Sequence, residues 1–282
     1  MPFIFLIIKH KLYFMARKKH IKDVDADDMA LIDAKMKAPA LSENYEYVDA
    51  YKNQLKALGF KLEIKCKNEK QKEFLNAMKD KSHQICFGIG APGTGKSFLS
   101  LSYALKELKE GNVSRIIMVI PTAPAGGKDL ELGYLKGDMD QKIEPFVQSD
   151  KETITKILKL SGNQDSTLLA GQLINGGLIK HEFVNFLLGK TLDDAIILVN
   201  EAEQYTKENM RLILTRLGEK SRFIITGDCE QVNRNSIVKG KDICGLSYVA
   251  DKLSDLGEVS ISTFSKYDIV RNKLITKILE RI

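Results

Sequence analysis

The chain of 282 residues carries a formal net charge of +6 at pH 7, with 44% hydrophobic and 28% charged residues. These values are typical of a soluble globular protein of one large or two small domains. The four cysteines form no Cys-x-x-Cys pair, which argues against a disulfide framework or a cysteine metal site and favours reduced thiols in a cytoplasm. The positive charge permits contact with nucleic acid, although a mildly basic, solvated surface explains it equally well.

The N-terminus combines an apolar run with basic residues in the order opposite to that of a secretory signal. Residues 3–8 are apolar, but a spanning helix needs about 20 such residues. The basic residues from Lys9 onward follow this run, whereas a signal peptide has them before it. We therefore predict no membrane partner and interpret residues 1–14 as an over-long start assignment ahead of Met15. A short membrane-touching anchor is the alternative.

Residues 1–64 are predicted to form a short N-terminal arm with a helix. Residues 17–40 mix lysine, arginine and aspartate, as in a flexible or loosely helical segment. Ser42 is suited to cap a helix that Gly59 ends. Residues 61–65 then alternate like an edge strand.

A glycine-rich loop follows the next helix and strand. Asn68 is suited to cap that helix, and residues 84–89 are typical of a short buried strand. The loop fits the phosphate-binding pattern G-x-x-x-x-G-K-[ST] and consists of Gly90, Ala91, Pro92, Gly93, Thr94, Gly95, Lys96 and Ser97. Residues 97–110 continue as a helix with leucines at helical spacing, and Gly111 ends it.

Strand, glycine loop and helix form the arrangement that phosphate binding needs. Glycines let backbone N–H groups turn toward a phosphate, and the helix N-terminus adds partial positive charge. Lys96 is expected to reach the β- and γ-phosphates of a nucleotide, and the Ser97 hydroxyl to bind Mg²⁺. Phe98 follows directly and is included among the predicted nucleotide contacts. A glycine-rich turn with no ligand is the alternative.

Strands and helices alternate through the rest of the chain, which indicates an α/β fold with a parallel sheet and helices on both faces. Further strands are predicted at residues 115–120, 195–199 and 222–226, with an alternating stretch at 259–261. Helices are predicted at residues 138–147, with Pro145 inside, at 154–160, 206–217 and 271–282. Residues 161–177 are interpreted as an insertion at one edge of the sheet. The predicted spatial order is 84–89, 222–226, 195–199, 115–120, all parallel.

Polar residues follow two of these strands. Glu201 comes just after strand 195–199, and Gln231 comes after strand 222–226. Because the carboxyl ends of parallel strands meet at one edge of a sheet, we expect both near the glycine loop. Glu201 is suited to orient and deprotonate a water for attack on a γ-phosphate, and Gln231 to hydrogen-bond that water or a γ-oxygen. The order of these segments predicts hydrolysis of a nucleoside triphosphate.

Gln71 lies on the helix that Asn68 caps, about twenty residues before the loop. In helicase-like ATPases a glutamine at this place binds the adenine edge, because its amide donates and accepts at once. A glutamine on a helix is otherwise a solvated residue, and both roles stay open for Gln71.

Several motifs occur in one order along the chain, at residues 88–97, 135–138, 142–145, 189–195, 214–218, 226–232, 245–246 and 268–271. In them the chain resembles the PhoH-like ATPases, which are phosphate-starvation-type proteins of bacteria and of many phages. The resemblance covers about residues 65–282 and implies a single RecA-like P-loop NTPase domain, related to the motor domain of superfamily 1 helicases. It also implies ATP and Mg²⁺ as cofactors, a ring-shaped homo-oligomer and a role linked to RNA. Residues 121–128 are similar to phage members, which implies the cytoplasm of a bacterial host.

The chain departs from the family at places that bear on the chemistry. The third strand usually ends Asp-Glu-Ala-Gln, whereas residues 200–203 are Asn-Glu-Ala-Glu. An aspartate in place of Asn200 would hold Mg²⁺, often through a water, and an amide keeps the hydrogen bond but loses the charge. We therefore predict a weak ATPase that needs more Mg²⁺ than usual, with Asp228 compensating at the metal. Residues 188–191 and Ile120 lack arginines common in the family, which weakens the case for nucleic-acid contacts.

An arginine is also expected at the γ-phosphate, because superfamily 1 motors supply one to stabilise charge in the transition state. Arg271 is the predicted residue, since it belongs to a matched motif at the start of the last helix. It would act in its own subunit or across a ring interface. Arg216 is the second candidate, and a salt bridge at the helix end is the other role open to Arg271.

The leading functional prediction is a Mg²⁺-dependent ATPase that couples hydrolysis to RNA, to another single-stranded nucleic acid or to a protein partner. A nucleotide-binding assembly module with little turnover is the alternative, and Asn200 is its best support. A P-loop kinase is disfavoured because Glu201 and the Gly-Asp-x-x-Gln run serve attack by water. A GTPase is disfavoured because the chain has no Asn-Lys-x-Asp guanine signature.

Overall fold

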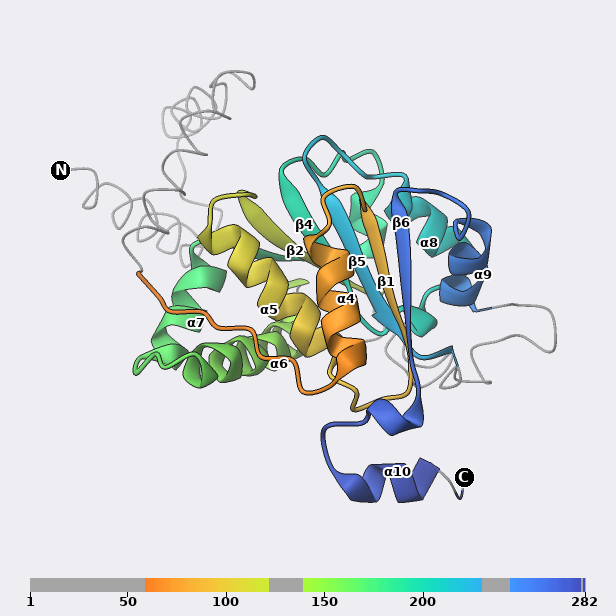
Figure 1. Ribbon diagram of the computed structural model, residues 1–282. Helices are drawn as coiled ribbons and strands as arrows, with labels where there is room; N and C mark the ends of the chain where they lie inside the picture. Colours follow the sequence, from red (N-terminus) through yellow and green to blue (C-terminus); the bar gives the residue numbers. More distant parts are fainter. Residues whose placement is uncertain (1–58, 122–138, 230–243, 280, 282) are drawn as a thin grey trace, which may run out of the picture. The chain divides into compact units, whose positions relative to one another are not determined.

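Six parallel strands form the sheet at the centre of the described structure (Figure 1). The strands are β1 (Ile85–Gly90), β2 (Arg115–Ile120), β3 (Ile179–Phe183), β4 (Ala195–Val199), β5 (Arg222–Gly227) and β6 (Val259–Phe264). Their order across the sheet is β3-β2-β4-β5-β1-β6, and every neighbouring pair is parallel. The predicted order of the four strands around the glycine loop is therefore confirmed.

The computed structural model describes residues 59–121, 139–229, 244–279 and 281. All of them belong to one unit of the chain, Ala50–Ile282. Residues 1–58 of the predicted N-terminal arm, which include the helix predicted from Ser42, and the predicted catalytic Gln231 lie outside the described residues.

Helices cover both faces of the sheet. Successive residues of a strand point to opposite faces, and in the central strands both sets are apolar and have to be buried. In β2, Ile116 and Met118 belong to a first core, and Ile117 and Val119 to a second core. The first core is completed by α4 (Glu69–Lys79), α5 (Lys96–Lys109), α6 (Met139–Leu160) and α7 (Ser166–Asn175). The second core is completed by α8 (Lys207–Leu214) and α9 (Gly245–Lys252). A final helix, α10 (Lys273–Leu279), follows β6.

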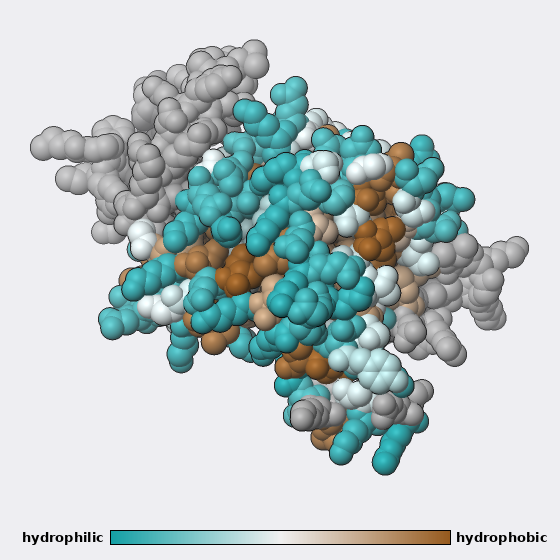
Figure 2. All heavy atoms as spheres, in the orientation of Figure 1, coloured by the Kyte–Doolittle hydropathy of each residue, from teal (hydrophilic) through white to brown (hydrophobic). Residues whose placement is uncertain are grey.

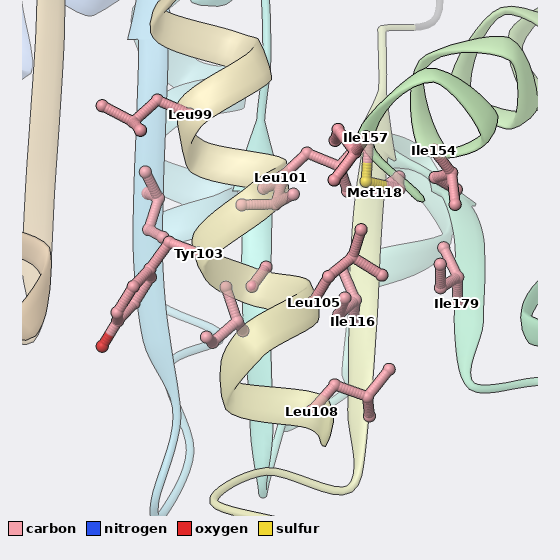
Figure 3. Packing of buried hydrophobic residues seen from close by; sticks show 14 of the residues in the cluster. Leu99, Leu101, Tyr103, Leu105, Leu108, Ile116, Met118, Ile154, Ile157 and Ile179 are labelled. Carbon is pink, nitrogen blue, oxygen red and sulfur yellow. The ribbon is translucent and has the colours of Figure 1, made fainter. Parts of the chain in front are cut away.

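The helix after the glycine loop packs its apolar side between the sheet and α6. Figure 3 shows Leu101 and Leu105 of α5 close to Ile116 of β2 and Ile157 of α6. The leucines recur at helical spacing, as the sequence predicted, and they anchor the helix whose N-terminus ends the loop. Gly111 follows this helix with φ of 73°, a conformation that glycine adopts easily.

The prediction of an edge strand at residues 61–65 is wrong. This segment is extended but lies in no described strand. Its N–H groups donate to side chains instead: that of Lys61 to Oδ1 of Asn163 (2.8 Å) and that of Glu63 to Oγ of Ser161 (3.0 Å). The alternating pattern arises because one side of the segment packs on the first core.

The region between β2 and β4 also differs from the prediction. Two helices were expected where α6 runs as one helix of 22 residues with Pro145 inside it. Residues 161–177, interpreted as an insertion, hold α7, which leads into the edge strand β3. The sequence of β3 has three consecutive polar residues between Ile179 and Phe183, so it lacked the apolar run of the central strands. His181 of β3 is bound to Asp150 of α6, with 2.9 Å between Nε2 and Oδ2.

Polar side chains cover most of the face that Figure 2 shows, with separate hydrophobic patches between them.

Two helices end earlier than predicted: α8 ends at Leu214, and α10 spans Lys273–Leu279. None of the described helices combines the length and the apolar character needed to cross a membrane.

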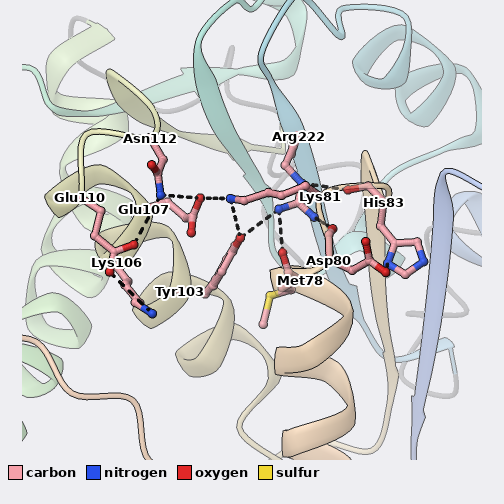
Figure 4. A network of polar contacts seen from close by, with 10 residues as sticks. All are labelled: Met78, Asp80, Lys81, His83, Tyr103, Lys106, Glu107, Glu110, Asn112 and Arg222. Carbon is pink, nitrogen blue, oxygen red and sulfur yellow. Dashed lines mark hydrogen bonds and ion pairs between the residues drawn. The ribbon is translucent and has the colours of Figure 1, made fainter.

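Arg222, at the start of β5, ties this strand to the end of α4 (Figure 4). Its guanidinium donates to the carbonyl oxygens of Met78 (2.6 Å), Asp80 (2.6 Å) and His83 (2.8 Å), and to the Tyr103 hydroxyl (2.9 Å). The last carbonyl groups of a helix have no partner within the helix, so a cation placed there satisfies them and offsets the helix dipole.

Replacement of Arg222 by methionine is expected to lower the free energy of unfolding by at least about 2 kcal/mol, because hydrogen bonds from a charged group are worth about 1.5–3 kcal/mol each. Arg222→Lys should recover only part of the loss, since an ammonium lacks the planar fork of a guanidinium. Chemical denaturation followed by circular dichroism measures both. Arg211→Met, at an exposed position of α8, is the matched control, and an equal loss in the two methionine variants would contradict the assignment.

Candidate nucleotide-binding site

The predicted phosphate loop connects β1 to α5 and turns on three glycines. Gly90, Gly93 and Gly95 have φ values of 127°, 77° and 88°, which side chains rarely tolerate. At Gly90 the constraint is also spatial, because a Cβ there would lie 1.8 Å from the carbonyl oxygen of Phe264. The same oxygen accepts a hydrogen bond from the Ala91 N–H at 3.2 Å. The end of β6 therefore fixes the start of the loop.

Residues 265–270, after β6, continue along the loop. The N–H of Val270 donates to the carbonyl oxygen of Gly93 at 3.0 Å. The side chain of Asn68, which caps α4, donates to the carbonyl oxygen of Asp268 at 3.0 Å. The loop, the start of α4 and the segment after β6 are thus joined. Sequence analysis missed this link, because backbone bonds between distant segments leave no pattern in the sequence.

Gln71 is buried beside the loop, with 5% of its surface exposed. Its Nε2 donates to the carbonyl oxygen of Thr94 (2.7 Å), and its Oε1 accepts from the Lys67 N–H (2.7 Å). Gly95 leaves room for this amide, since a Cβ there would lie 2.8 Å from Nε2. The described role of Gln71 is therefore to hold the loop, and its contact with adenine stays a prediction.

Lys96 lies at the centre of the loop and is buried. Its ammonium donates to the carbonyl oxygens of Gly90 and Ala91, the second at 2.8 Å. Burial lowers the pKa of Lys96 below its usual value, while the carboxylates of Asp228 and Glu203 act in the opposite direction. A buried cation surrounded by loop backbone is suited to bind an incoming phosphate.

Thr226 joins two of the residues predicted to bind a metal. Its Oγ1 lies 3.1 Å from Oγ of Ser97 and donates to Oδ1 of Asn200 at 2.9 Å. The hydroxyl and amide oxygens of this group fit Mg²⁺, which prefers oxygen ligands and takes few of them from protein when phosphates and waters supply the rest. Sequence analysis missed Thr226, because a threonine within a strand is common and carries no signal by itself.

Asp228, the third predicted metal residue, is buried just past β5. Its N–H donates to Oε2 of Glu203 at 2.9 Å. Within the described residues, no group of three or more His, Cys, Asp and Glu side chains is arranged to hold a metal. The role of Asp228 at the metal stays a prediction.

Glu201 has a backbone conformation that few residues other than glycine adopt. Its φ of 49° and ψ of 46° lie in the left-handed region, and such positions store strain mostly where function requires it. The carboxylate is exposed beyond β4 and accepts a hydrogen bond from Nε2 of Gln204. This position suits a group that must meet a water and a phosphate.

Glu203 is a site residue that sequence analysis did not select. Burial raises its pKa, and the hydrogen bond from the Asp228 N–H partly offsets this. Gly227 makes room for its carboxylate, since a Cβ there would lie 2.5 Å from Oε2. The available signal was the departure at position 203, where the family usually has glutamine and this chain has a carboxylate.

The two candidate arginines differ in their surroundings. Arg271 is exposed and directly follows Val270, whose N–H is bound to the loop at Gly93. The guanidinium of Arg216 donates to the carbonyl oxygen of Lys190 (3.3 Å). Arg271 therefore follows directly after a segment that contacts the loop. Arg216 is instead hydrogen-bonded to the backbone at Lys190.

All four cysteines are free, and two of them are neighbours at the edge of the site. Cys229 follows Asp228, and its thiol is hydrogen-bonded to that of Cys244. This bond and the N–H groups at the start of α9 lower the pKa of Cys244.

Gly90→Ala is expected to abolish nucleotide binding or to prevent folding, because the new Cβ would overlap the Phe264 carbonyl and the φ of 127° strains any other residue. Thermal unfolding and binding of a fluorescent ATP analogue measure the two effects. Gly257→Ala is the control, since a Cβ there would meet nothing within 4 Å. A Gly90→Ala variant that binds nucleotide like the unmodified protein would refute the close contact with Phe264.

A parallel α/β sheet, a phosphate loop between β1 and α5, and polar side chains after β4 and β5 together define a P-loop nucleotide-binding protein. The model of a family described as PhoH, PhoH-like protein, matches residues 63–282. The chain therefore belongs to the PhoH-like protein family, as its motifs indicated.

Curated relatives support this assignment. The PhoH-like protein of Bacillus subtilis is 33% identical over 217 residues, which are 77% of this chain and 63% of the relative. The PhoH-like protein of Mycobacterium tuberculosis is 32% identical and the protein PhoH of Escherichia coli 30%, each over 77% of this chain and 57% of the relative. The chain thus spans about three fifths of the length of these relatives.

Among solved structures, the chain is similar to the helicase MrfA bound to DNA, with a TM-score of 0.42 and 12% identity over 80% of this chain and 30% of that one. It is also similar to the large terminase of a thermophilic bacteriophage, with a TM-score of 0.40 and 13% identity over 79% of this chain and 50% of that one.

Proposed function

We propose that this protein binds ATP together with Mg²⁺ and hydrolyses it to ADP and phosphate. The observation that carries the proposal is the meeting of three groups at the carboxyl edge of the sheet. These are the buried Lys96 in the phosphate loop, the hydrogen-bonded chain from Ser97 through Thr226 to Asn200, and the strained Glu201 past β4. Family membership supports nucleotide binding by such a site.

In the proposed complex, N–H groups of the loop and the α5 N-terminus surround the phosphates. Lys96 exchanges its bonds to loop carbonyls for the β- and γ-phosphate oxygens. Ser97, and Asn200 directly or through a water, hold Mg²⁺, which neutralises charge on the phosphate oxygens when bound.

Hydrolysis in this proposal needs a base and a group that recognises the attacking water. Glu201 orients a water in line with the γ-phosphate and takes its proton as the new P–O bond forms and the bond to ADP breaks. Gln231 is proposed to bond this water or a γ-oxygen. Half-buried Glu203, which accepts the hydrogen bond of the Asp228 N–H, keeps the end of β5 in place beside β4.

The proposed role of the enzyme is to couple hydrolysis to RNA, to another single-stranded nucleic acid or to a partner, as a homo-oligomeric ring in the cytoplasm. A phage origin belongs to the same proposal. The net charge of +6 supports contact with a polyanion. The second candidate function is an assembly module that binds ATP with little turnover. Asn200 favours it, because an amide at the metal lacks the charge of a carboxylate.

Glu201→Gln is expected to lower the rate of ATP hydrolysis by at least about 100-fold, the usual contribution of a general base, while ATP binding persists. Phosphate release from purified protein, with and without single-stranded RNA, measures the turnover and its coupling. Glu219→Gln, at an exposed position beyond α8, is the matched control. If the unmodified protein binds ATP but releases phosphate no faster than Glu201→Gln, with or without RNA, the assembly module replaces the ATPase.

Arg271→Ala is expected to reduce turnover by at least about tenfold with little change in ATP affinity, because a transition-state arginine binds charge that develops during the reaction. Single-turnover kinetics separate this effect from binding. Arg281→Ala, at another exposed position near the C-terminus, controls for loss of positive charge. Unchanged turnover in Arg271→Ala would remove this residue from the site.

A further inference from the structure

Thr226 has an unusual place between the two sides of the proposed metal site. It lies on β5, which separates β1 from β4 in the sheet, and only 1% of its surface is exposed. Its hydroxyl meets Ser97 on one side at 3.1 Å and Asn200 on the other at 2.9 Å. Ser97 of the loop and Asn200 after β4 are thus joined by hydrogen bonds through Thr226, a residue of β5.

The direction of the hydrogen bonds follows from the number of protons. A threonine hydroxyl has one proton to donate, and that of Thr226 goes to Oδ1 of Asn200. The contact between Thr226 and Ser97 is then made by the Ser97 proton, which points toward Thr226. The lone pairs of Ser97 Oγ remain for another partner, and a lone pair is what a metal ligand must offer.

We propose that Thr226 is a positioning residue, which accepts the Ser97 proton and thereby presents the Ser97 oxygen to the divalent cation that accompanies the nucleotide. This inference rests on the proposed binding of ATP with Mg²⁺ but not on hydrolysis. It assigns Asn200 a task that needs no charge, because its oxygen has only to accept the proton of Thr226.

An amide and a carboxylate differ in how firmly they set this direction. A carboxylate at position 200 offers only acceptor oxygens, so the chain of bonds runs one way. An amide can also turn its NH₂ group toward Thr226. The chain of bonds then reverses, and Thr226 donates its proton to Ser97 and occupies one of the lone pairs. The direction of the chain is therefore less strictly fixed with Asn200 than with an aspartate.

Thr226→Val removes the hydroxyl and keeps the shape of the side chain. Its effect is measured as the Mg²⁺ concentration that gives half-maximal binding of a fluorescent ATP analogue, compared with binding in EDTA. We expect this concentration to rise about fivefold, the value of a typical hydrogen bond, with binding in EDTA unchanged. Thr226→Ser, which restores a hydroxyl, should return the value toward that of the unmodified protein. The unchanged binding in EDTA also shows that the variant is folded.

A double-mutant cycle separates the hydrogen-bonded chain from the direct effect of charge. Asn200→Asp should lower the Mg²⁺ requirement in the protein with Thr226. If Asn200→Asp acts through the hydrogen bond with Thr226, it should lower the Mg²⁺ requirement much less in the Thr226→Val background. A gain of equal size in both backgrounds would show that the aspartate acts directly on the metal and would overturn the proposal.

The remaining outcomes are also decisive. An unchanged Mg²⁺ requirement in Thr226→Val overturns the role of Thr226. If Thr226→Val fails to fold, Thr226→Ala in the same assay and the Asn200→Asp result take its place. Nucleotide binding by the unmodified protein that does not depend on Mg²⁺ overturns this inference and the proposed metal together. Because the assay measures binding, a protein that binds ATP with Mg²⁺ and does not hydrolyse it contradicts the ATPase alone.

Discussion

The close backbone contact between Gly90 and Phe264 is the constraint on which the site depends. The carbonyl oxygen of Phe264 occupies the place where a side chain at position 90 would lie, and it also binds the Ala91 N–H. β6 therefore fixes the start of the loop, and the segment that follows β6 reaches Gly93. Gln71 holds the far part of the loop from α4. The loop is thus shaped by the helix that precedes β1 and by a segment that lies far from it in the sequence.

The sheet order brings the polar residues together for a simple geometric reason. β5 lies between β1 and β4, so residues at its carboxyl end touch both the loop and the residues after β4. Thr226 does so through its hydroxyl, and Asp228 contacts the residues after β4 through the hydrogen bond from its N–H to Glu203. A strand in the middle position therefore carries the contacts that join phosphate binding to the proposed chemistry at Glu201.

The central strands and the loop could be predicted because their signals are local. An apolar run such as 195–199 marks a buried strand, and the glycine pattern marks the turn. The contact of Thr226 with Ser97 joins residues 129 positions apart, and no local pattern reports it. The strand β3 was missed because its polar residues suit an edge, and residues 61–65 were misassigned because alternation also arises in an extended segment on a core. The packing of Glu203 against Gly227 likewise joins residues that are distant in the sequence, so no local pattern indicates it.

The bond between the Val270 N–H and the Gly93 carbonyl has a consequence for the motions of the protein. Val270 stands just ahead of the exposed Arg271 and three residues before α10. Its amide hydrogen can exchange with solvent only when the chain after β6 and the phosphate loop separate. The exchange rate of this one amide therefore reports the opening of the loop, and any ligand that tightens the loop would slow it. The C-terminal segment would in this way register the occupancy of the loop through its backbone, independently of any side chain.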